Sequence, residues 1–147
     1  MENLLVVMDQ VRAETDKSEV IRLIRKHGHV LGTILMHAPT FQNDLDVVYE
    51  AVKFGTTNMY YASMEIRNNP DVAMELIRQD GLSLRYFGDT IRSNRDFVLA
   101  AIQKNGLALL YAPEFQEDEA MVRIAFEQNY KILPHLNETM RHKLMYD

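Results

Sequence analysis

The feature that most constrains the fold is an internal repeat of about 25 residues. The stretch NRDFVLAAIQKNGLALLYAPEFQE, which begins at Asn94, resembles the stretch NPDVAMELIRQDGLSLRYFGDTIRS, which begins 25 residues earlier at Asn69. Further steps of 25 residues backward and 24 forward reach Asp44 and Asp118, and a divergent copy with an insertion begins at Asp16. Units this short cannot bury an apolar face alone, so we expect them to stack on one another.

Each copy is predicted to begin with a capped helix. The first position of the copies is occupied by Asp16, Asp44, Asn69, Asn94 and Asp118. Side chains of these types accept hydrogen bonds from the free N–H groups at a helix start, and Glu19 adds the spacing of a capping box to Asp16. Apolar residues follow with the period of one helix face, as Phe97, Val98, Ala101 and Ile102 show in the fourth copy.

A second, shorter helix is predicted in each copy. The first helix is expected to end at a glycine in the left-handed conformation, namely Gly28, Gly81 or Gly106. The second apolar segment ends at a column of poor helix formers, which are Pro39, Ser63, Gly88 and Pro113. We therefore expect a short helix and then a brief helical turn, which is anchored by Phe41, Ile66, Ile91, Phe115 and Met140.

These patterns predict an all-α fold of one domain over residues 1–147. The expected architecture is a right-handed, α-solenoid-like stack of about five helical repeats, with capping helices at its ends. The repeats are predicted at 16–43, 44–68, 69–93, 94–117 and 118–142, and residues 2–14 are predicted to form the N-terminal cap.

The repeat resembles a known family of helical repeats. Its pattern is D-x-V-x-x-A-I-x-x-N-G followed by L-A-L-x-Y-A, and Arg95 to Ala112, RDFVLAAIQKNGLALLYA, is the closest match. This pattern is similar to the family called domain of unknown function 4116, and residues 44–117 carry it best. The fifth copy departs from it at Tyr130 and Pro134. The resemblance implies tandem helical repeats and implies no activity.

Composition and charge limit the classes of function. With 47% apolar residues the chain can form a core, and without cysteine it has neither a disulfide nor a thiolate site. A net charge of −5 argues against a general binder of nucleic-acid backbones. One basic patch, made of Arg22, Arg25, Lys26, His27 and His29, leaves nucleic-acid or anion binding as an alternative. Neither a membrane-spanning run nor a signal pattern is recognised, so we expect a cytoplasmic protein.

The histidines and acidic residues are the candidates for catalytic or metal-binding groups. His27, His29 and His37 could together ligate zinc. His37, however, shares its repeat column with Tyr61, Tyr86, Tyr111 and His135, which favours a ladder of packed rings whose polar tips bond to a neighbouring repeat. Acidic residues such as Asp44 lie at predicted helix starts, where the helix dipole favours negative charge. We predict no catalytic residue, metal or cofactor, and an enzyme of unknown class remains the second alternative.

Positions that vary between repeats are the candidate binding residues. One column of the second segment contains Tyr60, Arg85 and Leu110, and another contains Asn58 and Ser83; both are predicted to face solvent. Binding surfaces of solenoids are built from such positions. We therefore expect a non-enzymatic scaffold, monomeric or homodimeric, that binds another protein of unknown identity. A narrower expectation is an effector encoded by a pathogen or phage, which inhibits a host protein in the host cytosol.

Overall fold

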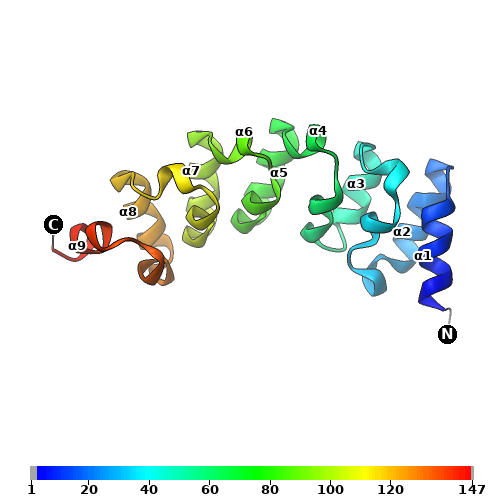
Figure 1. Cartoon of the computed structure of the whole chain (residues 1–147), viewed down its shortest axis with the longest axis horizontal. Coiled ribbons are helices and arrows are strands. Elements are labelled where there is room, and N and C mark those ends of the chain that lie inside the picture. The colour runs from blue at the N-terminus through cyan, green and yellow to red at the C-terminus, as the bar shows by residue number, and fades with distance from the viewer. Residues whose placement is uncertain (1–2, 147) are drawn as a thin grey trace. The chain divides into compact units, whose positions relative to one another are not determined.

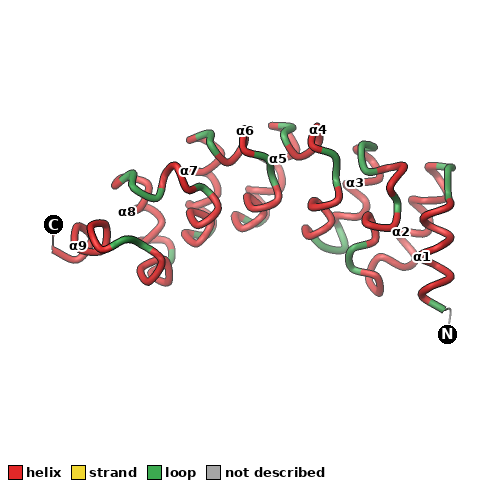
Figure 2. The backbone as a smooth tube through the Cα atoms, in the orientation of Figure 1, coloured by secondary structure: helices red, strands yellow, loops and turns green. Residues whose placement is uncertain are grey.

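The computed structural model describes residues 3–146, and these form helices with no β-strand (Figures 1 and 2). The α-helices are α1 (Leu4–Ala13), α2 (Lys17–Leu31), α3 (Leu45–Val52), α4 (Met64–Arg67), α5 (Pro70–Gln79), α6 (Asp89–Arg92), α7 (Arg95–Lys104), α8 (Glu119–Gln128) and α9 (Glu138–Tyr146). The 3₁₀-helices are η1 (Ile34–His37), η2 (Pro39–Phe41), η3 (Thr56–Tyr61), η4 (Gly81–Tyr86), η5 (Gly106–Tyr111), η6 (Pro113–Phe115) and η7 (Tyr130–His135). The prediction of an all-α fold is confirmed.

Contacts divide the chain into two compact units, Met1–Arg67 and Asn68–Asp147. In the first unit, α2 packs against both α1 and α3, and η1 packs against η3 (Figure 1). In the second unit, α7 packs between α5 and α8, while η5 contacts both η4 and η7. In each unit, therefore, the first α-helices of successive repeats contact one another, and so do the 3₁₀-helices that follow them. The single domain over residues 1–147 stays a prediction.

All the predicted helix caps are formed. The capping side chains and the N–H groups they accept from are Asp16 with Glu19, Asp44 with Asp46 and Val47, Asn69 with Asp71 and Val72, Asn94 with Asp96, and Asp118 with Met121. The capping box at Asp16 is only half formed, because the Glu19 carboxylate pairs with Arg22 and the Asp16 N–H donates to Glu14 Oε1. Local hydrogen bonding therefore sets where each first helix begins.

The prediction of left-handed glycines at the helix ends is wrong. Among the described residues, Gly32 is the one whose φ, 63°, lies in the range that favours glycine, and α2 continues through Gly28 as far as Leu31. Gly81 and Gly106 are instead required by close packing. A Cβ at Gly106 would overlap the carbonyl oxygen of Ala125 in α8, and a Cβ at Gly81 would overlap a carbonyl oxygen of α7. The missing side chain lets the backbone of one repeat touch that of the next.

A second set of caps separates the two helices of a repeat. Asp80, Asn105 and Asn129 follow α5, α7 and α8, and their side chains accept hydrogen bonds from the N–H groups of Leu82, Leu107 and Lys131. The predicted short second segment is confirmed, and it is a 3₁₀-helix. Because a 3₁₀-helix has three residues per turn, residues three apart in sequence share one side of it.

Apolar residues of both helices form the core of each unit. In α7, Val98, Ala101 and Ile102 are fully buried, and Leu109 of η5 is buried with them. The predicted anchors Phe41, Ile66, Ile91 and Met140 are buried, whereas Phe115 is half-buried.

Helix α1 occupies most of the predicted N-terminal cap, whose residue 2 lies outside the described residues. This helix buries Val7 and Val11 and leaves Leu4, Leu5 and Val6 exposed. No helix in residues 3–146 is both long and apolar enough to cross a membrane.

Candidate binding surface

The 3₁₀-helices present a regular outer side to solvent. The two outer positions of each six-residue 3₁₀-helix, three residues apart, are Thr57 and Tyr60 in η3, Leu82 and Arg85 in η4, Leu107 and Leu110 in η5, and Lys131 and Pro134 in η7. The two positions between them are buried in η3, η4 and η5, as Ala108 and Leu109 of η5 show, whereas in η7 Ile132 is buried and Leu133 is half-buried. The period of three therefore separates outer residues from core residues within each segment.

Four outer residues of the second unit form what we call the Leu–Arg face: Leu82, Arg85, Leu107 and Leu110. They come from η4 and η5, which contact each other, and all four are half-buried. Two of them, Arg85 and Leu110, are predicted binding residues. Sequence reasoning missed the leucines at 82 and 107, because their relation to the predicted positions depends on the 3₁₀ period.

Arg85 is held in place by two tyrosines. Its Cζ lies 4.7 Å from the ring centroid of Tyr86 and 6.0 Å from that of Tyr111, and its Nη2 donates a 2.6 Å hydrogen bond to the Tyr86 hydroxyl. Its Nε is buried and has no hydrogen-bond partner within the described chain. Burial opposes the charged form, but the hydroxyls of Tyr111 and Tyr86 outweigh it and hold the pKa of Arg85 above its usual value. The guanidinium is thus charged and oriented.

The first unit has its own exposed outer residues. Tyr60 of η3 has 55% of its surface exposed, as the sequence predicts, and Met36 of η1 has 45% exposed. Met36 precedes His37 just as Tyr60 precedes Tyr61, so the repeat alignment itself contained the signal that identifies it. Tyrosine and methionine are residue types enriched at protein interfaces.

The predicted solvent exposure of Asn58 and Ser83 is wrong, because both residues are fully buried. Asn58 Oδ1 accepts a 3.0 Å hydrogen bond from the Leu35 N–H, and Nδ2 donates to the carbonyl oxygens of Gly32, Ala51 and Gly55 at 2.7, 3.0 and 3.0 Å. This amide joins the loop before η1 to the end of α3, so it holds two repeats together. Ser83 Oγ is buried without a hydrogen-bond partner in the described residues. Neither side chain is accessible to a partner.

The predicted basic patch is largely neutralised. Arg22 pairs with Glu19 at 2.5 Å, and Arg25 makes a two-pronged contact with Glu50 at 3.0 and 3.1 Å. Arg25 first and Lys53 second lower the pKa of the Glu50 carboxyl to about 2. His27 is buried, so its imidazole is not part of an exposed patch, whereas Lys26 and His29 are exposed.

The histidines do not come together as a metal site. Within residues 3–146, no group of three or more His, Asp or Glu side chains is arranged to hold a metal ion. His37 is buried, and burial first and the charge of Arg12 second lower its pKa, so its ring is neutral at pH 7. Its Nδ1 has no hydrogen-bond partner among the described residues, so this atom does not form the predicted bond to a neighbouring repeat.

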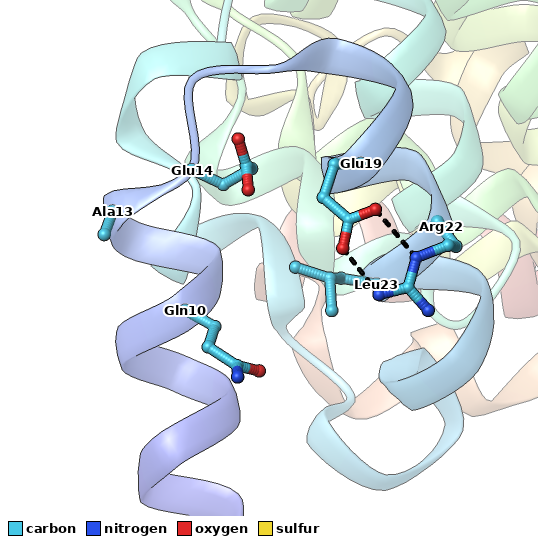
Figure 3. A pocket seen from close by; sticks show the side chains of 6 residues that line it. All are labelled: Gln10, Ala13, Glu14, Glu19, Arg22 and Leu23. Carbon is cyan, nitrogen blue, oxygen red and sulfur yellow. Dashed lines mark hydrogen bonds and ion pairs between the residues drawn. The ribbon is translucent and has the colours of Figure 1, made fainter.

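A pocket of about 320 Å³ lies between α1 and α2 (Figure 3). Both of its carboxylates are already engaged by the protein. Glu19 binds Arg22, and Glu14 Oε1 accepts the N–H groups of Thr15 and Asp16 at 2.8 Å. The pocket therefore offers no unpaired carboxylate that would bind a small cationic ligand.

Comparison with known proteins identifies the repeat. Residues 44–92 and 94–141 match the family model described as a domain of unknown function (DUF4116), which confirms the resemblance in the sequence. The matched stretches begin at the helix caps Asp44 and Asn94, and each contains two of the predicted units. No curated protein and no solved structure gives a significant match to the chain.

Proposed function

The chain belongs to the DUF4116 family, and on that premise we propose that it is a non-enzymatic helical-repeat scaffold that binds another protein. The outer sides of its 3₁₀-helices are the binding surface, and the Leu–Arg face is its centre in the second unit. The observation that carries this proposal is the separation of roles within η4 and η5. Their inner residues complete the core, while their outer residues place three leucines and one arginine at the surface.

The composition of this surface supports binding to a protein. Isolated exposed leucines are ordinary, but here Leu82, Leu107 and Leu110 recur at fixed positions of two helices in contact. They accompany an arginine, which is one of the residue types that dominate interface energetics. A protein partner can bury apolar and charged side chains together, and this face combines three leucines with one arginine.

We further propose that about five such repeats form a right-handed solenoid. Both family matches begin at a helix cap, and a cap of the same kind precedes α2, α3, α5, α7 and α8.

Acidic side chains at the helix starts have structural partners, since Asp44 pairs with Lys17 and Asp118 pairs with Arg95. This engagement favours a scaffold over acid–base catalysis by these residues.

Affinity capture from the native host tests the proposal. We expect the wild-type chain to retain a defined protein partner and Leu110→Asp to lose it, because a charge in the Leu–Arg face opposes burial of the leucines. Ala120→Asp is the matched control, since Ala120 is exposed on α8 outside that face. Equal capture by the wild type and Leu110→Asp, or repeated absence of any macromolecular partner, contradicts the proposal.

A further inference from the structure

We infer that the Leu–Arg face recognises a protein segment in which a carboxylate side chain is flanked by apolar side chains, with Arg85 binding the carboxylate. This inference rests on the proposed function and adds the chemistry of the partner to it. Its starting point is an arginine that the protein orients without neutralising.

Arg85 differs from most other arginines of the chain in its partners. Six arginines form ion pairs with carboxylates of the protein: Arg12 with Asp9, Arg22 with Glu19, Arg25 with Glu50, Arg92 with Asp89, Arg95 with Asp118, and Arg123 with Glu119. The partners of Arg85 in the described residues are instead the rings and hydroxyls of Tyr86 and Tyr111. These groups fix the guanidinium but leave its positive charge uncompensated.

The form of this site favours a carboxylate. A guanidinium presents several N–H donors in a rigid plane, and that plane matches the two oxygens of a carboxylate. The ring of Tyr86 and its hydroxyl fix the plane before a ligand arrives, which lowers the entropy lost on binding. Charge-assisted hydrogen bonds to such a preset donor are stronger than those between neutral groups.

The surroundings of Arg85 favour apolar neighbours on the same ligand. Leu82 lies three residues earlier on the outer side of η4, and Leu107 and Leu110 lie on the outer side of the adjoining η5. A segment that brings a carboxylate to Arg85 therefore covers half-buried leucines at the same time. Apolar side chains beside the carboxylate gain free energy by removing this surface from water.

The helices of this face contain no acidic side chain that would repel a partner's carboxylate. Although the chain has a net charge of −5, η4, η5 and η7 contain Arg85 and Lys131 and no acidic residue. Of the acids that flank Arg85 in sequence, Asp80 accepts the N–H of Leu82 with its carboxylate, and Asp89 pairs with Arg92. Two cations are too few for the multiple phosphate contacts on which nucleic-acid affinity depends, so a single carboxylate among apolar groups fits better than a polyanion.

Selection from a random dodecapeptide library displayed on phage tests the inference with the full chain. The wild type is expected to enrich peptides with Asp or Glu beside Leu, Ile or Phe. Arg85→Met keeps the apolar stem and removes the charge, so its selected peptides are expected to lose the acidic residue. Arg78→Met is the matched control, because Arg78 is exposed on α5 outside the face, and it should select the wild-type peptides.

Binding of one selected peptide by fluorescence anisotropy makes the test quantitative. Replacing the peptide's acid by its amide, or Arg85 by Met, is expected to weaken binding about tenfold, and the two changes together should weaken it no further. Arg85→Lys retains the charge without the rigid fork, so its affinity for the peptide is expected to lie between those of the wild type and Arg85→Met. It replaces Arg85→Met in the test if that variant does not fold. Thermal unfolding of each variant separates loss of binding from loss of structure.

The outcomes distinguish this inference from the proposed function. Apolar peptides that bind independently of Arg85 but are lost with Leu110→Ser overturn the carboxylate recognition and leave the scaffold function standing. Peptides that depend on neither residue, or no enriched peptide, count against both. A fluorescent single-stranded oligonucleotide that binds only when Arg85 is present, while peptides do not bind, overturns the assignment in favour of nucleic acid.

Discussion

The ammonium group of Lys17, the first residue of α2, lies 2.9 Å from Oδ2 of Asp44, the N-cap of α3. The same relationship recurs in the second unit, where Arg95 begins α7 and pairs with Asp118, the N-cap of α8. Where the N-cap is the neutral Asn94, the first helix of the preceding repeat, α5, begins with Pro70 instead of a cation. A charged cap therefore has two functions, because it caps the start of its own helix and binds the first residue of the first helix in the preceding repeat.

Substitutions at Asp118 should separate these two functions. Asparagine can accept from the Met121 N–H, as Asn94 accepts from Asp96, but it lacks the charge that attracts Arg95. We expect Asp118→Ala to lower the free energy of unfolding by about 1 kcal/mol through the lost cap, and Asp118→Asn to lower it by less. Urea unfolding measures both values. Equal losses for the two variants would show that the cap hydrogen bond is not what Asp118 contributes.

The buried amide of Asn58 should be among the most sensitive positions. Asn58→Ala leaves the Leu35 N–H and the Gly32 carbonyl oxygen without this partner and removes a second hydrogen bond from the carbonyl oxygens of Ala51 and Gly55, so we expect a loss of about 2–4 kcal/mol. Ser83→Ala is the control at the equivalent position of the next repeat. It removes a buried hydroxyl that has no partner in the described chain, so its effect should stay within about 0.5 kcal/mol. Thermal unfolding that ranks the two variants in the opposite order would contradict this assignment.

Alanine is expected to destabilise the chain at both Gly106 and Gly32, but by different amounts and for different reasons. At Gly106 the added methyl group meets the backbone of Ala125, which cannot move aside as a side chain can, so we expect a loss of about 2–4 kcal/mol. At Gly32 nothing lies within 4 Å of the added Cβ, and the cost is the positive φ alone, about 1 kcal/mol. Denaturant midpoints compare the two. A milder effect at 106 than at 32 would mean that the repeats can separate easily.

Glu50 should make the first unit sensitive to acid. Arg25 and Lys53 lower the pKa of its carboxyl from 4.5 to about 2 in the folded chain, so between these values the unfolded chain binds more protons. The stabilisation is therefore complete above pH 4.5 and is lost as the pH falls toward 2. We expect Glu50→Gln to cost about 1–2 kcal/mol at pH 7, after allowance for solvent screening, and almost nothing near pH 2.

Unfolding of the wild type and Glu50→Gln across this pH range measures the difference directly. Glu127→Gln is the control, since Glu127 is an exposed glutamate of α8. If the free energies of unfolding of the wild type and Glu50→Gln differ by the same amount at every pH, the ion pair is not the cause of the difference.

Features set by neighbours in the sequence could be predicted, and features set by neighbouring repeats could not. The caps from Asp16 to Asp118 follow from residues two or three positions away, so the pattern identified them all. Gly106 was correctly marked as special but for the wrong reason, because its contact with Ala125 lies 19 residues away. The alignment alone cannot distinguish a glycine that is needed for a left-handed conformation from one that is needed for close packing between repeats.

The candidate surface was predicted only in part, because variation between repeats was equated with exposure. Arg85 and Leu110 are at the surface, but the variable column of Asn58 and Ser83 is buried. Over six residues, the periods of an α-helix and a 3₁₀-helix cannot be distinguished by apolar pattern. The tyrosines that hold Arg85 are evident only when η4 and η5 are seen together.

The contact between Gly106 and Ala125 has a mechanical consequence for the unit Asn68–Asp147. Side chains can change rotamer to absorb compression, whereas two main-chain segments in direct contact cannot approach further. The distance between α8 and the start of η5 is therefore fixed by the thickness of the backbone itself. Outer residues such as Leu110 can be exchanged without altering this spacing, so new surface chemistry can be carried on an unchanged frame.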